Sequence, residues 1–182
     1  MTKKAKLIRN LFVLLVLILI IKTFSFGSFT ALSAFKKGER AANYGPSRIV
    51  KTIELDGKVL YLSKYDKWYS LSTVRKGFLG LWYPDYGFHG VLYNEDAPIE
   101  LIRSTSESSN HVSGIFHGIV NDPNIKSVKC SIKIDDRIKE LEQKELYENL
   151  ILLTVDEAGT NFEIVNIVGL DKDSKVIYEE NF

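Results

Sequence analysis

Three histidines are the residues with the widest chemical range in this sequence, and their spacing limits what they can do. His111 and His117 would share one face if residues 111–120 form a strand, but at about 3.3 Å per residue they would stand about 20 Å apart. In a helix, six residues would put them near opposite sides. Metal ligands and acid–base partners must converge within a few ångströms. We therefore expect surface or half-buried histidines, and a metal site completed by His89 is the less favoured alternative.

The cysteine, a serine cluster and an acidic turn are also expected to be structural. Cys130 alternates with apolar residues, which is typical of a small buried hydrophobe rather than of an exposed nucleophile. The cluster Ser104–Ser109 has no G-x-S-x-G or S-x-x-K frame and is expected to be a solvated loop. The turn Asp171–Ser174 lacks the glycine and distal glutamate of a calcium loop. The sequence thus predicts no catalytic residue, no metal and no cofactor.

One segment is unusually rich in aromatic residues. Ten of them fall within 33 positions: Tyr61, Tyr65, Trp68, Tyr69, Phe78, Trp82, Tyr83, Tyr86, Phe88 and Tyr93. Tyr and Trp combine apolar faces with polar tips, so such a segment could stack on sugar rings or bind a partner protein. We favour the alternative that half of them fill a core and the rest form cross-strand pairs. A ligand surface, if present, is expected at Trp82, Tyr83 and Tyr86, around a turn, together with Trp68.

The elements that must position these residues begin with a basic head and an apolar stretch. Lys3, Lys4, Lys6 and Arg9 precede Leu11–Ile21, whose anchoring side chains are expected to be Leu11, Phe12, Leu14, Leu15, Leu17, Leu19 and Ile21. This stretch would be only about 16 Å long as a helix, against about 30 Å of hydrocarbon. Widening it to Leu7–Phe26 gives a full span, with Arg9 and Lys22 reaching the two interfaces. We expect an uncleaved anchor with its N-terminus in the cytoplasm; the alternative is a signal peptide cleaved after Ala31-Leu32-Ser33, giving a secreted protein.

Charge is divided along the chain. Residues 1–40 hold eight basic residues and one acid, whereas residues 41–182 hold 16 basic and 22 acidic residues. An acidic domain without a basic cluster argues against nucleic-acid binding, and such a domain should be repelled by an anionic lipid surface. The single cysteine allows no internal disulfide, which suits a bacterial envelope better than a eukaryotic secretory route.

Beyond the apolar stretch, residues 36–47 are polar and contain two glycines and a proline, which predicts a linker. From residue 48 onward, short apolar runs alternate with turn signals, as in a sandwich or barrel. Asp56-Gly57 predicts a hairpin between strands 49–55 and 58–63. Residues 103–110 are expected to be a loop, 111–120 a strand, and 125–134 a strand with one buried face. Residues 135–147 could be either a helix or a polar strand.

Several frames in this pattern carry a resemblance. The segments GIVNDPNIKSVKCSI, IVGLDKDSKVIYEE and GKVLYLSKYDKWYSLSTVRKGFLGLW resemble small, uncharacterised membrane-anchored or secreted β-rich proteins of Gram-positive, spore-forming bacteria. The resemblance covers residues 50–180 through strand and turn patterns rather than catalytic motifs. It implies a β-rich fold and an exported location, and no activity.

We therefore expect a mainly β protein. Residues 1–35 would form the basic head and the transmembrane or signal-anchor helix, residues 36–47 a linker, and residues 48–182 one extracytoplasmic β-sandwich, Ig-like or related. Its expected role is non-enzymatic binding of a membrane or cell-wall partner, with the lipid bilayer contacted through the helix. The alternative is a carbohydrate-binding module that uses the aromatic turn near Trp82–Tyr86.

Overall fold

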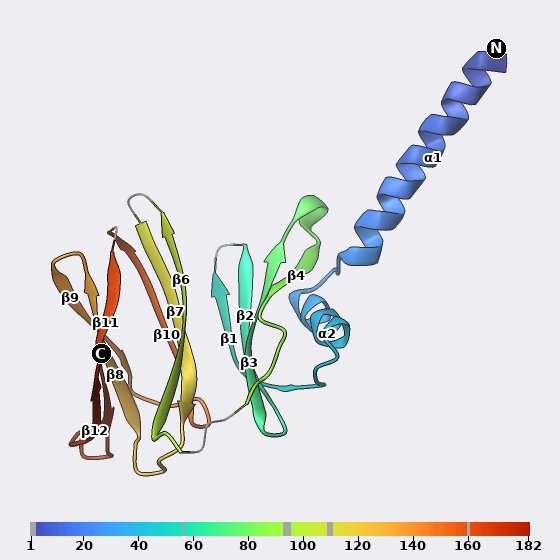
Figure 1. Cartoon of the computed structure of the whole chain (residues 1–182). Coiled ribbons are helices and arrows are strands. Elements are labelled where there is room, and N and C mark those ends of the chain that lie inside the picture. Colours follow the sequence, from blue (N-terminus) through green and yellow to red (C-terminus); the bar gives the residue numbers. More distant parts are fainter. Residues whose placement is uncertain (1–2, 56, 93–95, 109–110, 160) are drawn as a thin grey trace. The chain divides into compact units, whose positions relative to one another are not determined.

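The protein is mainly β, with antiparallel sheets and two helices near its N-terminus (Figure 1). A computed structural model describes residues 3–55, 57–92, 96–108, 111–159 and 161–182. The chain divides into two compact units. Unit 1 comprises Met1–Asp66 and Ser70–Gly90, and unit 2 comprises Lys67–Tyr69 and Val91–Phe182. The boundary between the units therefore falls inside the single domain expected over residues 48–182.

Unit 1 is a helix packed on an antiparallel sheet. After α1 (Lys3–Phe26) and α2 (Ala31–Ala41), the strands follow in the order β1 (Arg48–Leu55), β2 (Lys58–Tyr65), β3 (Trp68–Lys76) and β4 (Trp82–Tyr86), which is also their order in the sheet. A short 3₁₀ segment, η1 (Phe78–Gly80), lies between β3 and β4. The hairpin predicted at Asp56-Gly57 is confirmed by the β1–β2 pairing, in which Leu55 lies opposite Lys58; Asp56 itself lies outside the described residues.

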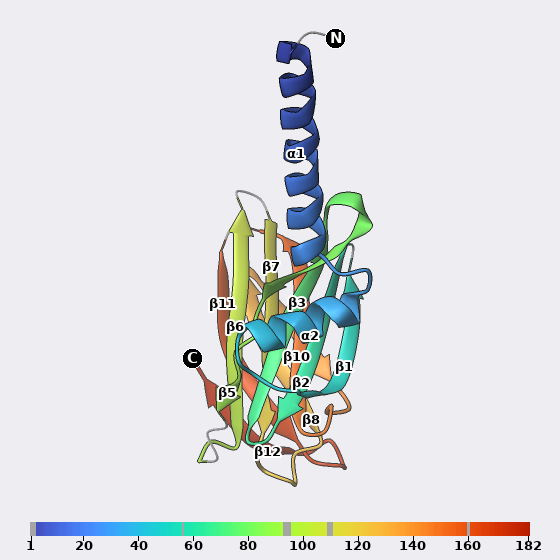
Figure 2. The same ribbon diagram turned by 90° about the vertical axis from the view of Figure 1, so that its right-hand side faces the viewer.

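Helix α2 covers one face of this sheet (Figure 2). Its buried residues Ala34 and Phe35 join Val59, Tyr61, Val74 and Phe88 in one core. The Phe35 ring lies 4.7 Å from that of Tyr61 and 6.1 Å from that of Phe88. Thr30 caps the helix, since its hydroxyl accepts the Ser33 N–H at 3.1 Å. The linker expected over residues 36–47 is therefore wrong in its first half, because amphipathic spacing outweighs the polar composition and Gly38.

Unit 2 consists of two antiparallel sheets that share a hydrophobic core. One has the order β10-β7-β6 and the other β12-β11-β8-β9, and β5 (Val91–Leu92) pairs with β3. The remaining strands are β6 (Ile99–Ser108), β7 (His111–Val120), β8 (Ser127–Ile134), β9 (Arg137–Gln143), β10 (Leu150–Ala158), β11 (Phe162–Leu170) and β12 (Val176–Asn181). The core draws on both sheets, with Phe116 and Ile151 from the first and Cys130 and Ile167 from the second.

The structure decides several predictions about these strands. The strand expected over residues 111–120 and the one-sided strand 125–134 are confirmed as β7 and β8. The ambiguous residues 135–147 contain a strand, β9. The loop expected over residues 103–110 is wrong over residues 103–108, because β6 continues to Ser108 and pairs with β7 from Ile99 onward; residues 109–110 lie outside the described residues. A polar sequence can form a strand when a neighbouring strand satisfies its backbone groups.

Candidate binding surfaces and buried polar groups

The predicted aromatic surface lies on a strand, not on a turn. In β4, Trp82 pairs with Lys76 and Tyr83 with Arg75, so the turn expected near Trp82–Tyr86 is wrong. Trp82 packs against the core between α2 and the sheet of unit 1. The Lys76 ammonium lies 6.0 Å from the centre of the Trp82 ring. Tyr83 lies against Gly77, where an added Cβ would meet its ring at 2.8 Å. Since successive strand residues face opposite sides, Trp82 and Tyr83 do not form a shared platform.

The other two predicted aromatics also lie apart. Tyr86 is 65% exposed near the end of β4. Trp68 is half-buried at the start of β3, opposite Leu92, whereas Trp82 pairs with the last residue of that strand. Eight strand residues separate these positions by about 26 Å. The four side chains therefore do not gather into one aromatic site.

Trp82 is instead joined by its backbone to the end of the first helix. Its N–H donates to the Ser28 carbonyl at 2.7 Å, and the Ser28 N–H donates to the Trp82 carbonyl at 2.8 Å. Ser28 follows the last residue of α1 by two positions. This paired bridge places the β3–β4 connection beside the chain segment that links α1 to α2.

Exposed apolar side chains flank this bridge. Phe29 is 79% exposed, Leu32 on the first turn of α2 is 42% exposed, and Leu79 in η1 is 67% exposed. Leu79 also has φ +58°, a conformation that costs a residue with a Cβ about 1–2 kcal/mol. Sequence reasoning missed these residues, because single apolar residues beside turns are ordinary in any chain.

Helix α1 carries a long apolar surface. Its large apolar side chains, 47–69% exposed, are Leu7, Ile8, Leu11, Phe12, Val13, Leu14, Leu15, Leu17, Ile18, Leu19, Ile20 and Ile21. They include every expected anchoring residue. None of the helices, over the residues that the structure describes, combines the length and hydropathy that crossing a membrane requires.

The two units carry opposite charges. Unit 1 contains 14 basic and five acidic residues, a net charge of +9, and unit 2 contains ten basic and 18 acidic residues, a net charge of −8. The overall value of +1 therefore conceals a basic unit that contains α1 and an acidic unit of paired sheets. The acidic excess assigned to residues 41–182 lies wholly in unit 2.

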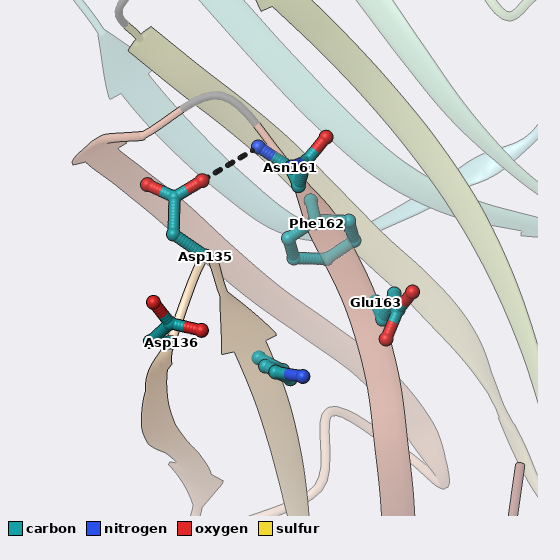
Figure 3. A pocket seen from close by; sticks show the side chains of 6 residues that line it. Asp135, Asp136, Asn161, Phe162 and Glu163 are labelled. Atoms are coloured by element: carbon teal, nitrogen blue, oxygen red, sulfur yellow. Dashed lines mark hydrogen bonds between the residues drawn. The ribbon is translucent and has the colours of Figure 1, made fainter.

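The polar pocket at one end of β8 and β11 does not bring reactive groups together (Figure 3). It has a volume of about 540 Å³ and is lined by Lys133, Asp135, Asp136, Asn161, Phe162 and Glu163. The Asp135 carboxylate accepts the Asn161 backbone N–H at 3.0 Å, so it is engaged in closing the loop. Among the described residues, no three His, Cys, Asp or Glu side chains lie in an arrangement that could hold a metal ion.

A second pocket lies where α2 leads into β1. Its lining includes Lys36, Glu39, Tyr44, Gly45 and Ser47. Glu39 is only 3% exposed, and one oxygen of its carboxylate accepts both the backbone N–H of Ser47, at 3.0 Å, and the Ser47 hydroxyl. Gly45 has φ +91°, and a Cβ there would lie 2.9 Å from the same oxygen. This buried carboxylate therefore holds the chain after α2 in place, and its hydrogen bonds are made to Ser47 within the protein.

Two further candidate residues are buried in unit 2. The Cys130 thiol is fully buried, which confirms the prediction of a small buried hydrophobe, and burial raises its pKa to about 11. His117 is 7% exposed, its ring lies edge-on to Tyr69 at 5.8 Å, and burial lowers its pKa to about 4. His89, in unit 1, is exposed. The side chains of His111 and of Ser104–Ser109 lie outside the described residues.

The acidic turn is a plain hairpin turn, as predicted. The Asp171 carboxylate accepts the backbone N–H groups of Asp173, at 2.8 Å, and Lys175, at 2.9 Å. It therefore stabilises the turn locally.

No family model, curated protein or solved structure matches the chain.

Proposed function

We propose that this protein is a membrane-anchored, extracytoplasmic binding protein without catalytic activity. In this proposal α1 is the anchor, the basic head stays in the cytoplasm, and both β-rich units lie outside and bind a partner in the membrane or the cell wall. Unit 2 would be a β-sandwich, Ig-like or related, since its two sheets share one core.

The observation that carries the proposal is the exposed apolar surface of α1. Twelve large apolar side chains are about half exposed along one helix. Removing such side chains from water is worth about 1.5–3 kcal/mol each when burial is complete, so transfer into lipid would stabilise this helix by on the order of 10 kcal/mol. Leu7–Ile21 alone is about 22 Å long, so a full crossing would use the helix as far as Phe26, its last residue.

The packing of α2 supports an uncleaved anchor over a secreted form. Cleavage after Ser33 would cut the first turn of α2, directly before the buried Ala34 and Phe35. It would also remove the Thr30 cap and the Ser28–Trp82 bridge. A cut at this place would therefore remove interactions that hold unit 1 together.

Carbohydrate binding is the second candidate, and the exposure of Tyr86 favours it. The separation of Trp82, Tyr83 and Trp68 weighs against a broad stacking platform. Titration of the protein with cell-wall glycan tests it: binding that survives Trp82→Ala and Tyr83→Ala would reject this choice of site.

Membrane fractionation of bacterial cells that express the full chain tests the main proposal. We expect the protein in the membrane pellet after alkaline carbonate washing, and degradation of both units by protease added to intact cells. Leu14→Lys with Leu17→Lys should release the chain, because a charged residue at the centre of a spanning helix costs about 2.5–3.5 kcal/mol. Leu55→Lys, an exposed leucine on β1, is the matched control and should stay in the pellet. A wild-type chain that carbonate extracts, or units protected from protease, would refute the proposal.

A further inference from the structure

We infer that the β3–β4 connection and the segment before α2 form a lipid-contacting surface that rests in the headgroup layer of the bilayer holding α1. The surface consists of Phe29, Leu32, Leu79 and the exposed Lys76. This inference rests on the proposed anchor, and it names the outer headgroup layer as a second binding partner of unit 1.

The first reason is the short stretch of chain between the end of α1 and Ser28. Phe26 is the last residue of α1. The backbone N–H and the backbone carbonyl of Ser28 both form hydrogen bonds with the backbone of Trp82. Two residues span at most about 7 Å. Once α1 lies in a membrane, Trp82 and the connection that precedes it must therefore lie close to the membrane surface.

The side chains at that level suit an interface rather than water. Phe29 and Leu79 are among the most exposed apolar residues of the described chain, at 79% and 67%. Leu79 is held at φ +58° between Gly77 and Gly80, so the strained backbone presents an apolar side chain outward. Trp82 is partly buried against the core, and the Lys76 ammonium lies near its ring. Tryptophan is amphipathic and favours the membrane–water interface.

Charge favours lipid headgroups as the occupant. Lys76 is exposed at the end of β3, next to this connection, where its ammonium can reach lipid phosphates. Of the acidic residues beside this connection, Asp85 on β4 is engaged, because it pairs with Arg75 at 3.2 Å. With residues 1–26 left out, because they would lie in the cytoplasm and the bilayer, unit 1 still holds nine basic and five acidic residues, a net charge of +4 that acts in the same direction.

The two tryptophans are native fluorophores for the test, because Trp68 begins β3 and Trp82 pairs with Lys76, the last residue of β3. Full-length Trp68→Phe retains Trp82 alone, and Trp82→Phe retains Trp68 alone. Each variant is reconstituted into phosphatidylglycerol–phosphatidylcholine vesicles with a spin label on the lipid headgroup, and vesicle flotation is recorded first. We expect quenching of Trp82 to be at least twofold stronger than quenching of Trp68. Leu79→Glu in the Trp68→Phe background should reduce the Trp82 quenching.

The outcomes separate the two proposals. A chain that fails to float with the vesicles would overturn both the anchor and the lipid contact. A chain that floats with equal quenching of the two tryptophans would overturn the lipid contact and leave the anchor standing. Repeating the comparison with pure phosphatidylcholine, whose headgroup has no net charge, distinguishes apolar contact from attraction to anionic lipid, since loss of the difference there would assign the contact to the basic residues.

Discussion

Substitution of Glu39 tests whether a buried carboxylate holds α2 to the sheet of unit 1. In the native protein this side chain is 3% exposed and accepts two hydrogen bonds from Ser47. In Glu39→Ala both donors lose their acceptor, and a cavity opens beside the buried Phe35. In Glu39→Gln the amide oxygen can still accept, so only the ionic part of each bond is lost.

The expected magnitudes follow from these contacts. A hydrogen bond to a charged group contributes about 1.5–3 kcal/mol, and a neutral one about 1 kcal/mol. Glu39→Ala should therefore lower the free energy of unfolding by about 3–4 kcal/mol and Glu39→Gln by about 1–2 kcal/mol. Ser47→Ala removes one of the two bonds and should cost about 2 kcal/mol. The costs of Glu39→Ala and Ser47→Ala should not add in the double variant, because they share one bond.

Urea unfolding in detergent micelles, followed by tryptophan fluorescence in the Trp68→Phe background, measures these values. Trp82 then reports on the core of unit 1 only, which matters because two units need not unfold in one transition. Lys36→Ala, at an exposed position on the same helix, is the matched control and should shift the midpoint little. A Glu39→Ala protein as stable as wild type would refute the role given to this carboxylate.

Three predictions concern unit 2. His117 has a folded-state pKa of about 4 against 6.5 for the free group, so the unfolded state gains its proton first as the pH falls. The contribution of His117 to the free energy of unfolding is therefore fully present above pH 6.5 and decreases by about 3 kcal/mol between pH 6.5 and pH 4. In urea titrations, His117→Gln should remove this part of the pH dependence of the free energy of unfolding. The Cys130 thiol should react with a disulfide reagent only after denaturation, because it is fully buried with a pKa of about 11. Gly118→Ala should destabilise unit 2 by at least about 2 kcal/mol in urea unfolding of the Trp82→Phe background, where Trp68 of unit 2 is the reporter, because the new Cβ would lie 2.0 Å from the Glu100 carbonyl oxygen.

Each of these predictions has its own contradicting result. An unchanged pH slope in His117→Gln would show that another group titrates there. Labelling of native Cys130 at the rate of a free thiol would contradict its burial in the core. For Gly118, the comparison is Gly57→Ala, where no atom lies within 4 Å of the added Cβ and only the φ of +66° is unfavourable. Equal costs at the two glycines would show that β6 and β7 are not closely packed there.

The strands could be predicted where sequence alternation coincided with burial. In β8, Val128, Cys130 and Ile132 point into the core and Lys129 and Lys133 away from it, and this period of two is visible in the sequence. The Asp56-Gly57 hairpin was also predictable, because Gly57 supplies the positive φ that a tight turn requires.

The errors arose where tertiary contacts outweighed local composition. Lys36, Gly38 and Arg40 give α2 the composition of a linker, but Phe35 packs on Tyr61, and Gly38 leaves the space that Phe88 fills. The β4 strand contains a proline and an aspartate that are typical of turns, and it is accommodated at the sheet edge by pairing with β3. Neither packing partner can be identified from the local sequence.

The candidate surface was beyond sequence reasoning for a related reason. The aromatic cluster drew attention to Trp82, and Trp82 does lie beside the exposed apolar residues, but through its backbone bridge to Ser28 rather than through neighbouring aromatic rings. The bridge joins positions 54 residues apart. Its consequence is geometric: whatever environment receives the end of α1 must also receive Trp82 and the connection before it. The basic unit contains both segments and the acidic unit contains neither. The apolar helix, the bridge and the exposed Leu79, all in unit 1, are therefore the observations on which the proposed membrane contact rests.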